Sequence, residues 1–203
     1  MNFIKKHYGW MIVALLAIFP MFILSNRLDI LTSDGLSITL IEGASKEGKS
    51  TLEMLYHISG EFAIRWMTAV LTCTPFFILF VGQAMGIATA VWSLIHFIIF
   101  IWAEGFLETF SQANYIAGFV AVLVLIPLLF TSNRKSMKAL KTNWKKLQNL
   151  SYLAILLSLL HVAILEKTWA IYAILVGLGF VIRIPAIKHR IIAFRKERKS
   201  SKV

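Results

Sequence analysis

Six apolar runs constrain this chain more than any other feature of its sequence. A helix that crosses a bilayer needs about 20 mainly apolar residues, and such runs lie at about 8–25, 61–80, 82–103, 114–130, 147–165 and 168–184. Hydrophobic residues make up 58% of the chain, and its mean hydropathy of +0.75 is too high for a soluble domain of this length. We therefore expect one all-α transmembrane domain over 1–203, folded as a bundle of six membrane-spanning helices.

The segments between the runs differ in charge, and the difference predicts the orientation of the chain. Lysine and arginine gather at the N-terminus, in a loop at 131–146 and in a tail at 185–203, whereas most acidic residues lie on the other side, many in a long outer loop at 26–60. Cytoplasmic segments carry the excess of positive charge, so both termini are predicted to be cytoplasmic. The net charge of +11 then indicates contact with anionic membrane lipid and not with nucleic acid.

A short stretch of the outer loop matches the sequence pattern of a nucleotide-binding motif. Residues 43–50 read GASKEGKS and match the phosphate-binding pattern G-x-x-x-x-G-K-[ST]. We reject a nucleotide site because the flanking sequence is too short for an α/β nucleotide domain and the orientation places it outside the cytoplasm. Ser50 and Glu53 instead fit a capping box, which predicts a surface helix over 50–57 that leads into the second span.

Two histidines lie deep within apolar runs, and they are the main candidates for a functional site. His96 follows Gly82 by 14 residues and His161 follows Leu147 by 14 residues, so each lies about 20 Å along a helix that runs outward. Ionisable side chains inside a membrane are costly and usually functional. Two imidazoles at one depth could bind a flat metal cofactor such as haem from both sides.

Other interpretations of the two histidines stay open. Each imidazole could simply form a hydrogen bond to a neighbouring helix. A zinc or non-haem iron site fits less well, because no carboxylate or cysteine lies at the same depth on these two spans.

Several blocks of the sequence resemble the ferric reductase-like transmembrane cytochromes. Within that family they are most similar to the MsrQ (YedZ) group, the haem-binding membrane subunits of the bacterial system that repairs periplasmic methionine sulfoxide. The blocks cover about 52–183 and read HISGEFAIRWMTAVLTCTP, MGIATAVWSLIHFIIFIWAE, NYIAGFVAVLVLIPLLFTSN and NWKKLQNLSYLAILLSLLH. The spacing of Trp144, Leu147, Tyr152 and His161 is their most specific part.

The resemblance implies a b-type cytochrome of the bacterial inner membrane, a multi-pass electron-transfer subunit and not a complete enzyme. It would pass electrons from a quinol or flavoprotein donor to a periplasmic reductase subunit, an MsrP-like molybdoenzyme. It places His96 and His161 on haem-ligand positions and implies no catalytic residue. Because no flavin- and nicotinamide-binding domain is expected in 185–203, the donor is expected to be a separate protein or quinol.

Two glutamines depart from the family pattern and bear on the number of haems. A further family histidine, 13 residues before the last, is Gln148 here, and Gln83 stands at the matching place before His96. Glutamine is a poor ligand for haem iron. We therefore expect one haem b per chain, with these inner-ligand positions vacant and the inner region empty of haem or used by quinone or FMN.

Two residues of the second helical region are candidate contacts of the cofactor. Arg65 would suit a haem propionate as a bidentate partner, although snorkelling or a pair with Glu61, four residues earlier, would also satisfy it. His57, at the outer water boundary, could contact a propionate or a quinone, or have only an interfacial role. Glu61 itself replaces a residue that is usually basic in the family.

Two functions other than electron transfer are compatible with the sequence. A haem-free membrane scaffold or binding protein that keeps the same fold would explain the two glutamines. A small transporter could line a polar path with Arg65, His96 and His161, but the internal repeats and broken helices typical of transporters are not clear in the sequence.

Overall fold

Helices dominate the structure, as the apolar runs predict. The computed structural model describes residues 2–25, 28–32, 35–40, 51–73, 79–165 and 169–200. The elements are α1 (Asn2–Ser25), β1 (Leu28–Thr32), β2 (Gly35–Leu40), α2 (Thr51–Cys73), α3 (Leu79–Glu104), the 3-10 helix η1 (Leu107–Phe110), α4 (Ala113–Thr131), α5 (Arg134–Leu140), α6 (Thr142–Gln148), α7 (Leu150–Leu165), α8 (Trp169–Arg183) and α9 (Pro185–Ser200).

Among the described residues, three helical segments are long and apolar enough to cross a membrane, namely Gly82–Glu104, Ala113–Thr131 and Thr142–Leu165. A fourth is added if Trp169–Arg183 and Pro185–Ile191, which are bent by 71° at their junction, form one broken span. The apolar stretch His7–Phe22 of α1 is shorter. The length and apolar composition of these helices indicate a membrane protein. The presence of six spans stays a prediction.

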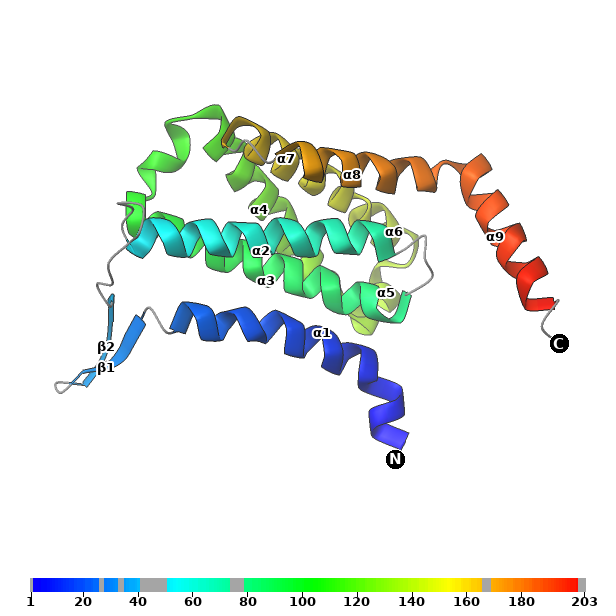
Figure 1. The fold of residues 1–203 in the computed structure, drawn as a ribbon, viewed down its shortest axis with the longest axis horizontal. Coiled ribbons are helices and arrows are strands. Elements are labelled where there is room, and N and C mark those ends of the chain that lie inside the picture. Colours follow the sequence, from blue (N-terminus) through cyan, green and yellow to red (C-terminus); the bar gives the residue numbers. More distant parts are fainter. Residues whose placement is uncertain are drawn as a thin grey trace.

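The long helices alternate in direction along the chain, so α3 and α7 run the same way (Figure 1). The closest packing is between α2 and α3 and between α4 and α7, while α1 lies along α3. The hairpin of β1 and β2 and the helix η1 lie at one end of the bundle (Figure 1). Both termini lie toward the other end, with α5 and α6 (Figure 1).

Small and aliphatic side chains fill the centre of the bundle. The largest cluster joins α2, α3, α4, α7 and α8 and includes Met67, Leu125 and Val176. A second cluster contains Leu55, Ala63 and Trp92. Trp92 of α3 connects helix α1 to the bundle, because its buried indole N–H donates a hydrogen bond to the carbonyl of Ala17 at 3.1 Å. These contacts fix the relative positions of the helices that carry the histidines.

The outer segment at 26–60 contains more regular structure than a loop. Strands β1 and β2 pair antiparallel, with Leu28 opposite Leu40 and Thr32 opposite Gly35. Helix α2 begins at Thr51 and continues without a break to Cys73, so the surface helix predicted over 50–57 and the first part of the span predicted over 61–80 form one helix. Residues 74–78 lie outside the described part of the chain, and the last two residues of the predicted span belong to α3. The phosphate-binding pattern at 43–50 lies outside the described residues.

The basic segments are also helical. The predicted loop at 131–146 contains α5 and α6, which meet at Lys141, where the backbone has a φ of 48°. Asn133 starts α5, because its side chain accepts a hydrogen bond from the amide of Ser136 at 2.9 Å. The predicted tail at 185–203 forms α9 over Pro185–Ser200. These basic segments therefore have regular backbone hydrogen bonds at the end of the bundle.

Candidate functional site

A cavity of about 560 Å³ lies among helices α2, α3, α4 and α7, with η1 and α8 each adding one side chain. Its walls are mainly aliphatic and aromatic, and both histidines singled out from the sequence line it. The volume falls within the range of ligand and cofactor pockets, about 300–1,000 Å³. The expected meeting of the third and fifth apolar runs therefore takes place around a space large enough for a cofactor.

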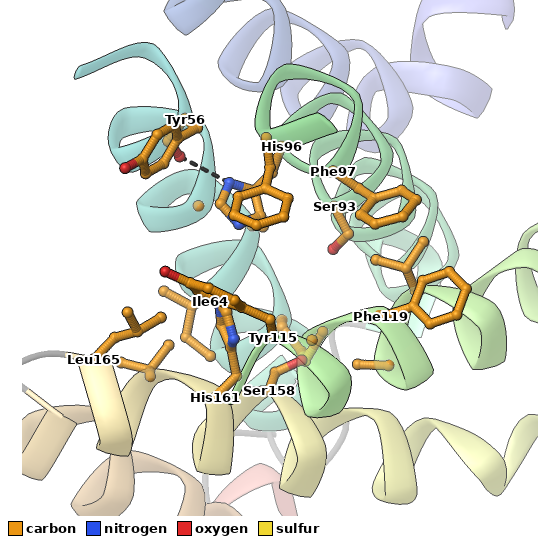
Figure 2. A pocket seen from close by; sticks show the side chains of 18 of the residues that line it. Tyr56, Ile64, Ser93, His96, Phe97, Tyr115, Phe119, Ser158, His161 and Leu165 are labelled. Atoms are coloured by element: carbon orange, nitrogen blue, oxygen red, sulfur yellow. Dashed lines mark hydrogen bonds between the residues drawn. The ribbon is translucent and has the colours of Figure 1, made fainter. Parts of the chain in front are cut away.

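His96 from α3 and His161 from α7 enter the cavity from opposite sides (Figure 2). Their ring centroids are 6.2 Å apart and their planes are inclined by 67°. An imidazole nitrogen lies about 2 Å from a bound metal, so two rings on opposite sides of one metal have centroids roughly 6 Å apart. The observed separation fits that arrangement.

Both imidazoles are held by backbone carbonyls. Nδ1 of His96 lies 2.7 Å from the carbonyl oxygen of Tyr56, the contact dashed in Figure 2, and Nδ1 of His161 lies 2.7 Å from that of Asn114. Because a carbonyl can only accept, each Nδ1 carries the hydrogen and the lone pair of the neutral ring is on Nε2. Histidines that bind metals usually donate their other N–H in this way.

Two imidazoles suit a metal that brings most of its own ligands. Within the part of the chain that the structure describes, no group of three or more His, Cys, Asp and Glu side chains is placed to hold a metal ion. A haem needs only axial ligands from the protein, since the macrocycle fills the other positions. The residues present therefore fit a haem better than a metal ion bound by protein alone.

The comparisons with known proteins agree with this chemistry. Over 128 residues the chain is 30% identical to the protein-methionine-sulfoxide reductase heme-binding subunit MsrQ of Deinococcus radiodurans, covering 56% of this chain and 63% of that protein. Over 135 residues it is 32% identical to the subunit of the same name from Xanthomonas campestris pv. campestris, covering 59% of this chain and 62% of that protein. The chain is MsrQ-like. The resemblance predicted from its sequence blocks is confirmed.

The aligned region spans less than two thirds of each MsrQ relative, 63% and 62% of their lengths. No family model matches this chain. No solved structure matches it either. The likeness to MsrQ therefore rests on sequence.

In this MsrQ-like chain, one of the two candidate residues of α2 lines the cavity and the other does not. His57 lines the cavity, with Nε2 3.7 Å from a carboxylate oxygen of Glu61, which also lines it. Arg65 is not among the lining residues, and its side chain is 54% exposed. Its guanidinium forms an ion pair with Glu61 and lies 5.7 Å above the ring centre of Phe62. Of the alternatives that the sequence offered for Arg65, the structure shows the ion pair with Glu61.

The two glutamines do not line the cavity and lie at the C-terminal end of α4. Gln83 donates its side-chain N–H to the carbonyl of Ser132, and Gln148 donates to the hydroxyl of Thr131 at 3.2 Å. Trp144 adds a third bond, from its indole N–H to the carbonyl of Thr131 at 2.9 Å. The last carbonyls of a helix lack partners within the helix, and here side chains from α3 and α6 supply them.

One cavity residue was missed by the sequence analysis. Thr109 of η1 is only 1% exposed and lines the cavity, yet its hydroxyl has no hydrogen-bond partner among the described residues. Buried polar atoms without partners are rare in native proteins and often mark the place of a ligand or water. Its position in a short 3-10 turn between two apolar runs has no sequence motif that would have revealed it.

A tyrosine supplies a further hydrogen-bond donor in the cavity. Tyr56 lines the cavity, and its ring packs edge-on against Phe100 with centroids 6.1 Å apart. Burial, and then the charge of Glu104, raises the pKa of the Tyr56 phenol above its usual value. The phenol is therefore protonated at neutral pH and available to donate a hydrogen bond.

Proposed function

We propose that this chain is a haem-binding membrane subunit of the MsrQ type, a b-type cytochrome that transfers electrons and is not a complete enzyme by itself. The observation that carries the proposal is the pair His96 and His161, with ring centroids 6.2 Å apart and with each Nδ1–H donated to a carbonyl. The relatives support it, since both are named as heme-binding subunits of a methionine-sulfoxide reductase.

In this proposal Nε2 of His96 and Nε2 of His161 are the axial ligands. A haem held between them would supply one-electron redox chemistry. The chain's own contribution is to orient the two imidazoles and to surround them with apolar walls that exclude water. His57 would contact a propionate or a quinone at the cavity wall, whereas Arg65 would act only through its ion pair with Glu61.

We propose one haem b per chain. The amide groups of Gln83 and Gln148 are engaged at the end of α4, and neither residue lines the cavity. This arrangement supports an inner region without haem, in which a quinone or FMN could receive or deliver electrons. The donor would be a quinol or a flavoprotein.

The membrane arrangement belongs to the same proposal. We propose six spans within a single domain over 1–203, both termini in the cytoplasm of a bacterium, and an acceptor on the periplasmic side that resembles the MsrP molybdoenzyme. The position of the basic helices α5 and α6 at the same end as both termini supports this orientation (Figure 1). Lipid with anionic headgroups would face these helices.

A reduced-minus-oxidised optical spectrum of the purified protein tests the proposed function. We expect a low-spin b-type spectrum in the parent protein, and its loss in both His96→Ala and His161→Ala, with most copies purified without haem. The matched control is His189→Ala, which changes an exposed histidine on α9 and should keep the parent spectrum. An unchanged spectrum in either cavity variant would reject the pairing, and a parent protein without haem would favour the scaffold function.

A further inference from the structure

His96 is fitted against a glycine of helix α2. A Cβ atom placed on Gly60 would lie 3.0 Å from Cε1 and 3.1 Å from Nδ1 of the His96 ring. The carbonyl that holds this ring belongs to Tyr56, four residues before Gly60. In an α-helix that carbonyl also faces the amide of Gly60. The missing side chain at Gly60 is therefore what lets the imidazole approach a carbonyl already used within the helix.

His161 is fitted against helix α4 in the same way. A Cβ atom placed on Gly118 would lie 2.9 Å from Nδ1 and 3.2 Å from Cε1 of the His161 ring. The carbonyl that holds the ring is that of Asn114, again four residues before the glycine. Glycine is unfavourable in a helix interior, and at both positions a bulkier residue would displace an imidazole.

The arrangement is a local repeat that is also visible in the sequence. The residues that end at Gly60 read HISG and those that end at Gly118 read YIAG, so an isoleucine, a small residue and a glycine recur in the same order. Other helical glycines differ, since a Cβ atom on Gly82, Gly86 or Gly177 would meet nothing within 4 Å. The contact is thus particular to the two glycines that face the histidines.

We propose that Gly60 and Gly118 are positioning residues, which open one helix carbonyl each to His96 and His161 and so set the tautomer and ring orientation of both histidines before a cofactor binds. The helix pairs α2–α3 and α4–α7 then supply one imidazole each by the same construction. Any effect of this orientation on a bound haem rests on the proposed function. The tautomers themselves are a property of the empty protein.

The two halves of the repeat differ at two positions, and the difference directly before the glycine affects the carbonyl. Ser59 is fully buried, donates its hydroxyl to the carbonyl of Tyr56 at 2.9 Å and lies 3.4 Å from Nδ1 of His96. The corresponding residue before Gly118 is Ala117, which has no donor. The hydroxyl shares the carbonyl with His96 and weakens the bond from its Nδ1–H. A weaker bond there makes the imidazole less basic, so His96 is the weaker electron donor of the pair.

The tautomers can be measured in haem-free full-length protein labelled with ¹⁵N-histidine, using imidazole nitrogen NMR in detergent. Signals are assigned by their loss in His96→Gln and His161→Gln. We expect Nδ1–H at both cavity histidines in the parent. Gly60→Ala should change only the signals of His96, Gly118→Ala only those of His161, and the control Gly86→Ala neither. Unchanged signals in both Gly60→Ala and Gly118→Ala would overturn the inference.

A gentler pair of variants covers the case in which an alanine at either glycine prevents folding. Ser59→Ala removes the competing hydroxyl, and Ala117→Ser adds one to the other half. The Nδ1–H proton signal of His96 should move to lower field in Ser59→Ala, and that of His161 to higher field in Ala117→Ser. If neither signal shifted, the residue before each glycine would have no effect on the hydrogen bond between the carbonyl and the imidazole, contrary to the inference.

Haem-loaded protein gives a second readout. Gly60→Ala and Gly118→Ala should each weaken haem retention about 10–100-fold, as loss of an outer hydrogen-bond partner does at metal sites, and Gly86→Ala should not. Ser59→Ala should lower the midpoint potential and Ala117→Ser should raise it. Failure of every variant and the parent to bind haem would reject the proposed function and leave the NMR result standing. Normal haem binding with insensitive tautomers would reject only the role of the glycines.

Discussion

Gln148 of α6 donates a hydrogen bond to the hydroxyl of Thr131, the last residue of α4, at 3.2 Å. Gln83 of α3 reaches the neighbouring carbonyl of Ser132. The amide groups of both glutamines therefore stabilise the C-terminal end of α4. This use of the two side chains has a consequence for cofactor content.

The purified protein should contain one haem per chain. Of the three histidines that line the described cavity, His96 and His161 form the facing pair, and the glutamines that replace plausible inner ligands are hydrogen-bonded elsewhere. A pyridine haemochrome assay together with a protein determination measures the ratio. A value near two would require another ligand and would contradict the reasoning from Gln83 and Gln148.

Replacement of His57 should alter the haem without removing it. His57 lines the cavity but is exposed and lies 3.7 Å from Glu61, so it is placed as an outer contact and not as an axial ligand. In His57→Ala we expect a shifted midpoint potential or a faster loss of haem, with the low-spin spectrum retained. If this variant lost low-spin haem while His96→Ala or His161→Ala kept it, the ligand would have been assigned to the wrong helix.

Thr109→Val should act in opposite directions on the empty and the loaded protein. The buried hydroxyl of Thr109 has no partner among the described residues, and an unsatisfied polar group costs about 1–3 kcal/mol. Valine has the same shape, so the haem-free protein should gain stability, whereas a ligand that accepts a bond from the hydroxyl should be held less tightly.

Thermal unfolding with and without haem measures both effects of Thr109→Val. The matched control is Thr68→Val, because the buried hydroxyl of Thr68 donates to the carbonyl of Ile64 at 2.8 Å. That variant should lose about 1 kcal/mol and leave haem retention unchanged. Lower stability of haem-free Thr109→Val would mean that its hydroxyl is satisfied after all.

Gly179→Ala should destabilise the bundle where α8 meets α2. A Cβ atom on Gly179 would lie 2.7 Å from Cδ2 and 2.8 Å from Cγ of Leu71, and overpacking of this kind costs about 1–3 kcal/mol. Gly177→Ala, on the same helix with nothing within 4 Å of its Cβ, should be neutral or stabilising by up to about 1 kcal/mol. Equal melting temperatures for the two variants in detergent would show that this contact relaxes easily.

Reporter fusions test the orientation in the membrane. A reporter joined at Lys199, in the basic C-terminal helix, and one inserted within 45–49 should report opposite sides, because the charge asymmetry places the first in the cytoplasm. Matching sides would reject the predicted six-span arrangement.

Several features could be predicted from the sequence because they depend on local patterns. Apolar length and charge predicted the helices, and the bounds expected for the third and fourth spans, 82–103 and 114–130, differ little from Leu79–Glu104 and Ala113–Thr131. The equal spacing of His96 and His161 from the starts of their predicted apolar runs anticipated that the two rings meet, with centroids 6.2 Å apart. Their role as haem ligands stays a prediction.

Other features depend on contacts between distant segments and gave no local pattern. The carbonyls of Tyr56 and Asn114 bind rings 40 and 47 residues away, and a carbonyl is present at every residue, so nothing in the sequence distinguished these two. For Arg65 the sequence offered a cofactor contact or a pair with Glu61, and the structure shows the pair with Glu61. The antiparallel hairpin before α2 arose in a segment read only as a polar loop.

Helix α4 is hydrogen-bonded at both ends to side chains from other helices, so it links α6 to His161. Its 19 residues give it a length of about 28 Å. At one end the carbonyl of Asn114 accepts a hydrogen bond from His161. At the other end the carbonyl of Thr131 accepts a hydrogen bond from Trp144 of the basic α6. A movement of α6 would therefore be transmitted along α4 to the carbonyl that orients His161, and so would alter the proposed haem site from outside the cavity.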